Sequence, residues 1–408
     1  MMNMRRSALM PVVVLLLCGC GGAGPQRVEA QMPDGGSESK LAVADVNDGG
    51  HDDLSPFLTY LKGNGAPPVD YVVGKFSDHD VVILGEMHEV RECLEFVSDL
   101  IPALYHRAGV RCLATEFLRH RNTALANRIV TSPEYDEAAV VGLYRDFVGI
   151  WGFREYMDVF KAVWALNNSL PPEAEKFRVV GLDGELEEYD VISAPEQQRE
   201  ELMQKLWKRD EYMAGVFVRE ALQQGGKALI HTGYMHSFVH YRLPVLSDGE
   251  LTGEMEPRLG GILSQEYGDR VFQVCLHQWH FSPELFSGGQ PIPRPVLGGL
   301  VEKVLAANGG QPVGFDVEGS PFANLRDRNS CYFAYQDGVV FADLAQGYVF
   351  IRPVKELTTR CTWVKGFISE SNFEKARGMA LQRGWIAEDE CTTPLDLDER
   401  ISALFGGR

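Results

Sequence analysis

The chain contains five short apolar runs, and each is followed directly or within four residues by Glu, Asp or His. The runs occupy residues 80–85, 110–115, 177–182, 227–232 and 270–276. Continuous apolar runs of this length, rather than alternating patterns, are typical of strands buried on both faces of a parallel sheet. Segments with helical periodicity lie between them. The order predicts an α/β fold, a mostly parallel sheet flanked by helices with right-handed crossovers.

The expected helices cover residues 90–107, 119–147, 155–167 and 195–224. Pro102 is expected to kink the first, and Ser132 and Pro133 interrupt the second. The 195–224 stretch should be the longest helix, with one buried stripe composed of Leu202, Leu206, Met213, Phe217 and Leu222.

The last third of the chain has a weaker pattern. Residues 282–295, rich in Pro and Gly, predict an irregular loop, and residues 339–344 and 348–352 predict a hairpin at the sheet edge. Residues 356–408 predict a C-terminal appendage of short helices, and the α/β domain is expected to span residues 67–355.

The N-terminus has the features of an export signal, with Arg5 and Arg6 before a short apolar stretch. Residues 17–20 (LCGC) resemble a bacterial lipobox, which makes residues 1–19 a lipoprotein signal peptide and Cys20 the lipid-carrying residue. An ordinary signal peptide cut near Ala23 is the alternative. Residues 20–66 then form a disordered tether, because their first part is poor in large apolar side chains.

These features predict a bacterial cell-envelope protein. Since no Asp follows Cys20, resemblance to other lipoproteins favours the outer membrane. A formal net charge of −18 argues against nucleic-acid binding and against an anionic membrane surface, which leaves the lipid anchor as the only membrane link. Outside the export region, a disulfide between Cys361 and Cys391 is the preferred single bridge, whereas Cys112 and Cys275 lie in strand runs as buried thiols.

The polar residues after the runs should share one crevice, because the carboxyl ends of parallel strands meet at one edge of a sheet. Glu86 and His88, two residues apart, should point to the same side. A general base, or a metal ligand fixed by its carboxylate, is the chemistry that this pair supports. A local hydrogen bond of His88 at a helix N-terminus is the alternative. The other runs deliver Glu116, Asp183 with Glu185, and His236.

Carboxylates gathered in one crevice need a positive partner, because they would otherwise raise one another's pKa values. A metal ion, protonated histidines or an arginine such as Arg91, Arg119 or Arg154 would serve. Asp183 could instead cap a helix.

Histidine spacings supply a second, weaker signal. His236 with His240, and His277 with His280, are spaced to share a metal or to face an oxyanion. Glu86, His88 and His236 are the candidate metal ligands, although no HExxH motif is present. The absence of GxSxG, GxGxxG and Walker A motifs disfavours a serine hydrolase or a nucleotide-dependent enzyme.

Several of these motifs together resemble the erythromycin esterase, ChaN-like and Tiki superfamily. They are residues 81–92 (VVILGEMHEVRE), Glu116, Trp151 with Glu155, Asn167, the VVGLD run ending at Asp183, and GYMH ending at His236. The spacing from Glu86 to His88 is that of ChaN-like haem-binding lipoproteins, whereas the block from Trp151 to Asn167 and Asp183 look more like the esterases.

The resemblance implies a role for each matching residue. His88 would be the general base that activates water and Glu86 its orienting partner. Glu116, Glu155 and Asp183 would form an acidic wall, and His236 would face the oxyanion or the leaving group.

Three hypotheses follow. The leading one is a surface-anchored hydrolase of an ester or amide bond in a small molecule or peptide, with or without a divalent metal. The second is a haem- or iron-binding lipoprotein, in which an exposed Tyr234, His277 or His280 reaches the metal. The third is a purely structural lipoprotein. Metal and haem content would separate the first two.

Overall fold

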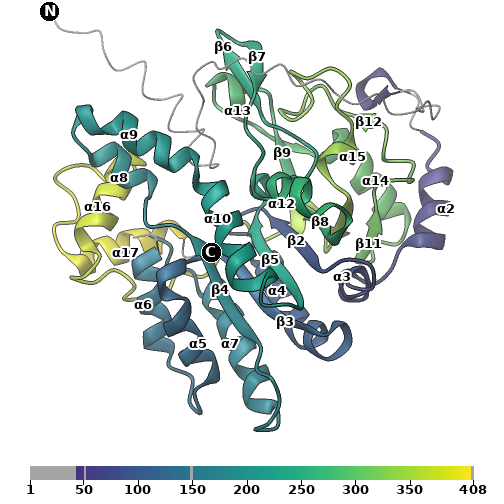
Figure 1. Ribbon diagram of the computed structural model, residues 1–408. Coiled ribbons are helices and arrows are strands. Elements are labelled where there is room, and N and C mark those ends of the chain that lie inside the picture. The colour runs from purple at the N-terminus through teal and green to yellow at the C-terminus, as the bar shows by residue number, and fades with distance from the viewer. Residues whose placement is uncertain (1–42, 50–51, 148–149, 406–408) are drawn as a thin grey trace, which may run out of the picture.

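The computed structural model describes residues 43–49, 52–147 and 150–405, and its centre is a seven-stranded sheet. The strand order is β11-β13-β8-β2-β5-β3-β4, and every neighbouring pair is parallel except β11 with β13. The predicted fold class is therefore confirmed, and each of the five apolar runs overlaps a strand of this sheet (Figure 1). The strands are β2 (Val81–Glu86), β3 (Val110–Arg119), β4 (Arg178–Asp183), β5 (Lys227–Gly233), β8 (Val271–Leu276), β11 (Val313–Asp316) and β13 (Gly347–Phe350).

Helices cover both faces of the sheet because successive strand side chains point to opposite sides. Along β2, Val82 and Leu84 join one apolar core, and Val81 and Ile83 join another. The first face packs on α3 (Pro68–Lys75), α4 (Arg91–Ala103), α5 (Thr123–Thr131), α6 (Glu137–Phe147) and α7 (Arg154–Ser169). The second packs on α10 (Arg209–Phe217) and α12 (Leu259–Tyr267).

A third apolar core lies beside β11 and β13 and includes α2 (Ser55–Asn64) and α14 (Leu300–Ala307). Phe57 and Leu61 of α2 are buried in it, and Ala66 forms a bridge with Gly314. The ordered fold therefore begins before residue 67, and the predicted tether of residues 20–66 is wrong for this part. Cys20 and the rest of the export region lie outside the described residues.

Shorter elements complete the chain. The remaining strands are β1 (Ala44–Asp45), β6 (Pro244–Ser247), β7 (Glu250–Glu254), β9 (Trp279–Phe281), β10 (Pro293–Pro295) and β12 (Leu325–Arg326). The remaining α-helices are α8 (Glu188–Ser193), α9 (Glu196–Trp207), α11 (Tyr234–Ser237), α13 (Glu284–Ser287), α15 (Phe341–Leu344), α16 (Phe373–Gln382) and α17 (Pro394–Phe405). Two π-helical turns, η2 (Leu104–Ala108) and η4 (Val218–Leu222), follow α4 and α10. Short 3-10 turns are η1 (Val46–Asp48), η3 (His120–Asn122), η5 (Gly268–Arg270), η6 (Val296–Gly299) and η7 (Val354–Glu356).

The predicted hairpin near the end of the domain is wrong. Residues 341–344 form α15, whose Phe341 and Leu344 are buried a helical turn apart and whose Asp343 side chain accepts a hydrogen bond from Val340 N. β13 lies between β8 and β11 inside the sheet, not in a hairpin at its edge. The predicted loop of residues 282–295 also contains α13 and a strand, β10, that pairs with β9.

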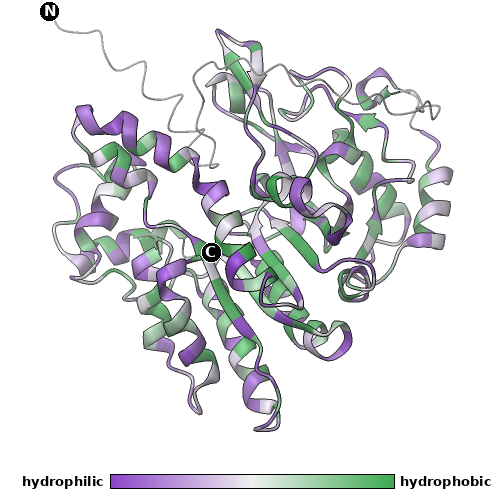
Figure 2. Cartoon of the chain, in the orientation of Figure 1, coloured by the Kyte–Doolittle hydropathy of each residue, from purple (hydrophilic) through white to green (hydrophobic). Residues whose placement is uncertain are grey.

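The predicted long helix is divided into α9 and α10. Met213, Phe217 and Leu222 are buried as expected, but no described residue of α9 is buried, so the prediction for Leu202 and Leu206 is wrong. α9 is largely hydrophilic (Figure 2). No helix among the described residues is long and apolar enough to cross a membrane.

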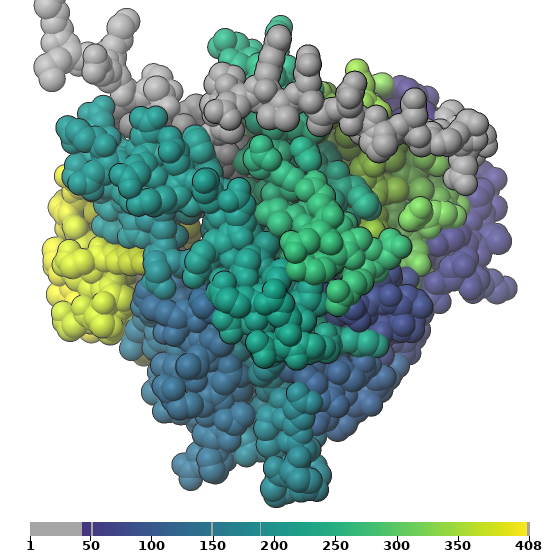
Figure 3. All heavy atoms as spheres, viewed as in Figure 1, coloured from purple at the N-terminus to yellow at the C-terminus, as the bar shows by residue number. Residues whose placement is uncertain are grey.

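The C-terminal segment packs into the first core rather than hanging beside it, since Trp363, Phe367 and Leu397 are buried there. In Figure 1, α16 and α17 lie beside α8, and Figure 3 shows a small opening between the α8–α10 region and neighbouring atoms, with C-terminal residues behind it.

Cys361 and Cys391 are free, so the predicted bridge is not formed. The buried Cys361 thiol lies against Glu155, whereas Cys391 Sγ lies 3.7 Å from the carbonyl oxygen of Asp396.

Asp398 holds the C-terminal segment in place, and we expect its substitution to destabilise this segment. The buried carboxylate accepts hydrogen bonds from Trp363 Nε1 (3.1 Å), Gly366 N (2.7 Å) and Ile368 N (3.0 Å). Because Asp398→Ala leaves these donors without a partner, we expect it to lower the free energy of unfolding by about 2–4 kcal/mol in denaturant titration. Asp396→Ala, an exposed position on the same helix, is the matched control and should change it by less than about 0.5 kcal/mol. Equal effects of the two substitutions would contradict this role.

Candidate functional site

The site lies at the carboxyl edge of the sheet, where four adjacent strands end. Glu86 of β2 stands level with Gly233 of β5, and Asp183 of β4 with Arg119 of β3. An irregularity in β3 between Thr115 and Arg119 separates that last pair from the regular register. Glu116 lies within this irregular stretch. The parallel register is thus the reason that residues far apart in sequence meet here.

Glu86 is a fully buried carboxylate with three partners. Its Oε1 accepts a hydrogen bond from Tyr156 Oη (2.6 Å) and lies 3.3 Å from His88 Nδ1, and its Oε2 lies 2.7 Å from His231 Nε2. Burial would raise the pKa of this carboxyl, but His231 and His88 outweigh burial and lower it. Glu86 is therefore an ionised group held in one orientation.

His88 links the two halves of the site. Its Nδ1 faces Glu86, and its Nε2 lies 4.0 Å from Glu116 Oε1. Burial lowers the pKa of His88, but the carboxylates of Glu86 and Glu116 raise it above the usual value. The side chain is nevertheless 34% exposed, so a ligand can reach it.

The His88 ring is bordered by aromatic side chains and by a glycine. Phe117 and Trp151 meet its ring edge-on, with centroids 5.4 Å and 5.5 Å away. On the other side is Gly233, where a Cβ atom would lie 2.5 Å from His88 Cε1. The imidazole therefore needs a glycine at the end of β5.

Glu116 is buried and accepts hydrogen bonds from Gly233 N (2.8 Å) and from the Thr232 hydroxyl. Burial would raise the pKa of this carboxyl, but His236, Arg209 and His88 outweigh it and lower the pKa to about 2. The carboxylate is thus ionised at any physiological pH.

Arg209, the first residue of α10, is the cation among these groups. Its Nε donates to Asp183 Oδ1 (2.7 Å), its Nη2 lies 3.6 Å from Glu116 Oε1, and its Nη1 lies 3.2 Å from His236 Nε2. Its side chain is 21% exposed, so it also borders the accessible space.

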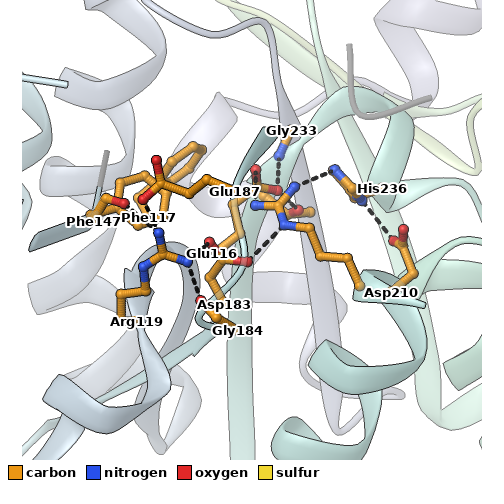
Figure 4. Close-up of polar contacts among 12 residues, drawn as sticks. Glu116, Phe117, Arg119, Phe147, Asp183, Gly184, Glu187, Asp210, Gly233 and His236 are labelled. Carbon is orange, nitrogen blue, oxygen red and sulfur yellow. Dashed lines mark hydrogen bonds and ion pairs between the residues drawn. The ribbon is translucent and has the colours of Figure 1, made fainter. Parts of the chain in front are cut away.

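His236 lies beside Asp210, as Figure 4 shows. Its Nδ1 lies 2.6 Å from Asp210 Oδ1, and Asp210 also accepts a hydrogen bond from Leu259 N (2.8 Å). Arg258 Nη2 lies 3.2 Å from His236 Nδ1, and burial of Asp210 is outweighed by Arg258 and His236, which lower its pKa. His236 is therefore enclosed by two arginines and one carboxylate.

Arg119 closes the opposite side of the site (Figure 4). It is buried, pairs with Asp183 Oδ2 (3.4 Å) and Glu187, and donates to the carbonyl oxygens of Gly184 and Phe147. Asp183 is the last residue of β4 and pairs with two arginines, so it is not the helix cap that was the alternative for it.

Glu155 does not join this group, although the resemblance placed it in the acidic wall. Its Oε1 accepts hydrogen bonds from Arg91 Nε (3.0 Å) and the Thr362 hydroxyl (2.7 Å), and its Oε2 accepts one from Thr362 N (2.8 Å). It therefore connects α7 and the start of α4 to the C-terminal segment. Glu185, the other carboxylate predicted after β4, is exposed and pairs with Arg121.

The predicted metal ligands Glu86, His88 and His236 do not form a metal site. In the described parts of the chain, no three His, Cys, Asp or Glu side chains are grouped to hold a metal ion. Glu86 is already bound by Tyr156 and His231, and the nitrogens of His236 face arginines, whose positive charge opposes a second cation. The donor set does not fit a divalent metal.

The predicted haem ligands are buried in the third core. Tyr234, His277 and His280 are 5%, 1% and 1% exposed. His280 Nε2 lies 3.4 Å from the Tyr234 hydroxyl, and His277 Nδ1 lies 2.7 Å from the Tyr348 hydroxyl. Burial lowers the pKa of His280 to about 3, so it stays neutral. None of the three is the exposed ligand that the haem hypothesis requires.

Sequence reasoning missed His231, Tyr156 and Arg209. His231 lies inside an apolar strand run, Tyr156 directly follows the predicted Glu155, and Arg209 lies within the predicted long helix. The alternation of strand side chains is a usable signal for His231, because it continues the face of Leu229. No local pattern marks Tyr156 or Arg209.

Comparisons with known proteins found similar solved structures, and both kinds of protein that the motifs resemble are among them. No protein-family model matches the chain, and no curated protein sequence matches it. Among solved structures, the erythromycin esterase EreC shares 13% identity over 73% of this chain and 95% of its own, with a TM-score of 0.47. Haem-bound ChaN of Campylobacter jejuni shares 15% over 50% and 84%, with a TM-score of 0.33. A succinoglycan biosynthesis protein shares 11% over 74% and 98%, with a TM-score of 0.49. These similarities concern the fold alone.

The low pKa of Glu116 predicts a specific acid response. A carboxyl whose folded-state pKa is depressed stabilises the protein above its unfolded pKa of 4.5 and loses that contribution as the pH falls toward about 2. Glu116→Gln removes the charge and leaves Arg209 and His236 without it. We therefore expect the variant to be less stable than wild type by on the order of 3 kcal/mol at pH 7, with the gap shrinking below pH 4.5. Urea titrations of both proteins measure this difference in the free energy of unfolding, and a difference independent of pH would contradict the prediction.

Proposed function

We propose that the protein is a metal-independent hydrolase of an ester or amide bond, with His88 as the general base. The observation that carries this proposal is the arrangement of the imidazole. Its Nδ1 faces a fully buried, doubly anchored carboxylate, while the side chain remains 34% exposed beside Glu116. A histidine oriented in this way by Glu86 carries its proton on Nδ1 and has Nε2 free to accept one.

The reaction follows from this geometry. Nε2 of His88 accepts a proton from a water molecule, whose oxygen attacks the substrate carbonyl carbon. The carbon–oxygen or carbon–nitrogen bond of the substrate then breaks, and the imidazolium returns the proton to the leaving group. Arg209 borders the same space, and its guanidinium charge favours the oxyanion that forms. His236 and Asp210 fix the orientation of Arg209.

The alternatives have less support. Haem binding lacks an exposed ligand at Tyr234, His277 or His280. A purely structural role leaves unexplained why a protein keeps ionised groups in an accessible crevice, which is costly without use. Haem titration of the purified protein without a Soret shift supports the hydrolase, and a stoichiometric shift favours the ChaN-like alternative.

Removal of the base should abolish turnover. On a panel of esters and peptides, we expect His88→Ala to lower kcat/KM by roughly 10²- to 10⁴-fold, the usual contribution of a general base. His240→Ala is the matched control, because His240 is exposed and lies outside the site. Equal activity of wild type and His88→Ala would remove the proposal.

The pH profile tests the pairing of Glu86 with His88. Because the neighbouring carboxylates raise the pKa of His88, kcat/KM should rise with pH through a value above 6.5, as the imidazole loses its proton. Glu86→Gln removes one stabilising charge from the imidazolium, so the midpoint should move to lower pH and the plateau should fall. A midpoint that moves upward or stays in place would show that His88 is not the titrating base.

We also propose that the protein is exported and carries a lipid on Cys20, at the outer membrane of a bacterial cell envelope. The lipobox-like sequence supports this. Cys20→Ser should abolish labelling by a radioactive fatty acid and release the protein from the membrane fraction, whereas Cys18→Ser, two residues away, should leave both unchanged. Labelling of the Cys20→Ser protein would show that the anchor lies elsewhere, and no labelling of wild type would favour the ordinary signal peptide.

A further inference from the structure

Two helices beside the site, α4 and α7, begin in the same way. The first two residues are Arg91 and Glu92 in α4, and Arg154 and Glu155 in α7. The residue before each pair is a valine in one helix and a phenylalanine in the other, so neither side chain can accept a hydrogen bond. The N–H groups of a first helical turn have no partner within the helix, so another part of the chain has to bind them.

One stretch of the C-terminal segment, residues 358–364, binds the start of α4, and we call it the strap. The carbonyl oxygen of Thr358 accepts a hydrogen bond from Arg91 N (3.1 Å). The N–H group and the hydroxyl group of Thr358 both donate to the Glu92 carboxylate, at 2.8 Å each. Thr358 therefore caps α4, although it lies 266 residues from Glu92 in the sequence.

The strap binds the start of α7 in the same pattern. The carbonyl oxygen of Thr362 accepts a hydrogen bond from Arg154 N (2.9 Å), and its N–H and hydroxyl groups donate to the Glu155 carboxylate (2.8 Å and 2.7 Å). Val364 N then donates to the carbonyl oxygen of Gly152 (2.8 Å), just before the helix. One continuous stretch of chain thus joins the starts of both helices.

The two helix starts carry rings that meet in the candidate site. His88 lies three residues before Arg91, and Trp151 lies three residues before Arg154. The rings of His88 and Trp151 meet edge-on, with their centroids 5.5 Å apart. A shift of either helix start would therefore change the contact between the imidazole and the indole.

The backbone that follows His88 needs support from α7. Glu89 has a φ of 64°, in the left-handed region that is unfavourable for a residue with a side chain. Such a conformation persists only where the surrounding structure holds it. Glu89 N donates to Tyr156 Oη (3.1 Å), and this hydroxyl donates in turn to Glu86 Oε1 (2.6 Å). Because Tyr156 belongs to the first turn of α7, the orientation of His88 depends on where α7 begins.

We propose that the strap is a positioning element of the candidate site. By capping α4 and α7 together, it fixes the imidazole of His88 against Trp151 and Glu86. Thr358 and Thr362 are its positioning residues. The effect of the strap on turnover rests on the proposed hydrolase, whereas its effect on the orientation of His88 does not. The C-terminal segment therefore serves the site as well as the fold.

A single hydroxyl group tests the orientation of the imidazole. Thr362→Val keeps the shape and the main-chain bonds of the residue and removes the hydroxyl bond to Glu155. Thr362→Ser keeps that bond, and Thr359→Val, at an exposed position of the strap, is the matched control. The ring currents of the aromatic side chains around His88 displace the proton NMR signal of its Cε1–H, which is identified by its absence from His88→Ala. We expect this signal to move in Thr362→Val and to stay in place in the other two variants.

The same variants test turnover. With p-nitrophenyl butyrate as the substrate, we expect Thr362→Val to lower kcat roughly tenfold and to change KM by less than about twofold, because a misplaced base slows the chemical step. Thr358→Val removes the corresponding hydroxyl bond at α4 and should change kcat in the same direction. Thr362→Ser and Thr359→Val should keep the kcat of wild type.

A strap that only stabilises the fold would give a different result. The Cε1–H signal of His88 and kcat would then stay as in wild type in Thr362→Val, whether or not its Tm falls, and this result overturns the proposal. An equal change in Thr359→Val also overturns it. The proposed hydrolase fails separately. If wild type and His88→Ala are equally inactive while the signal moves in Thr362→Val, the hydrolase is wrong and the positioning of His88 by the strap stands.

Discussion

The charge balance at one sheet edge is the constraint on which the site depends. Glu86 and Asp183 are the last residues of β2 and β4, Glu116 lies in the irregular part of β3 between them, and all three carboxylates are buried. Buried carboxylates without cations would take up protons or unfold the edge. Arg209 therefore has to begin α10 at this point, since its guanidinium reaches both Glu116 and Asp183. The positions of α10, and through Asp210 of α12, follow from this need.

The sequence predicted that some positive partner was required, but not which residue. Of the three arginines considered, Arg119 lies in the site, whereas Arg91 pairs with Glu155 and Arg154 with Glu137. The role of Arg209 was not predictable. Helical periodicity predicts the position of a helix, but it does not predict which polar side chain of the first turn faces inward. The carboxylates themselves were predictable, because each of them directly follows an apolar run that predicts a strand.

The same distinction explains which parts of the fold were predictable. The strands β2, β3, β4, β5 and β8 are buried on both faces, so their apolar runs are continuous and their order follows from the alternating helices. β11 is short and contains a glycine where Tyr71 packs against the strand, so no periodic signal marked it. α9 shows the opposite case, since its composition favours a helix while none of its described residues is buried. Burial is decided by neighbours that the local sequence does not contain.

Hydrogen-bond satisfaction separates the polar residues that hold the fold together from those available for chemistry. The carboxylate oxygens of Glu155 and Asp398 accept hydrogen bonds from donors within the protein, and both residues connect the C-terminal segment to the core. The haem-ligand candidate His280 is likewise occupied by a tyrosine and a serine hydroxyl in the third core. His88 and Arg209 differ, because both are firmly oriented by buried partners and yet remain partly exposed. A group that is fixed at one end and open at the other is available to a ligand, and for this reason the proposed chemistry lies at His88 and Arg209 rather than in the third core.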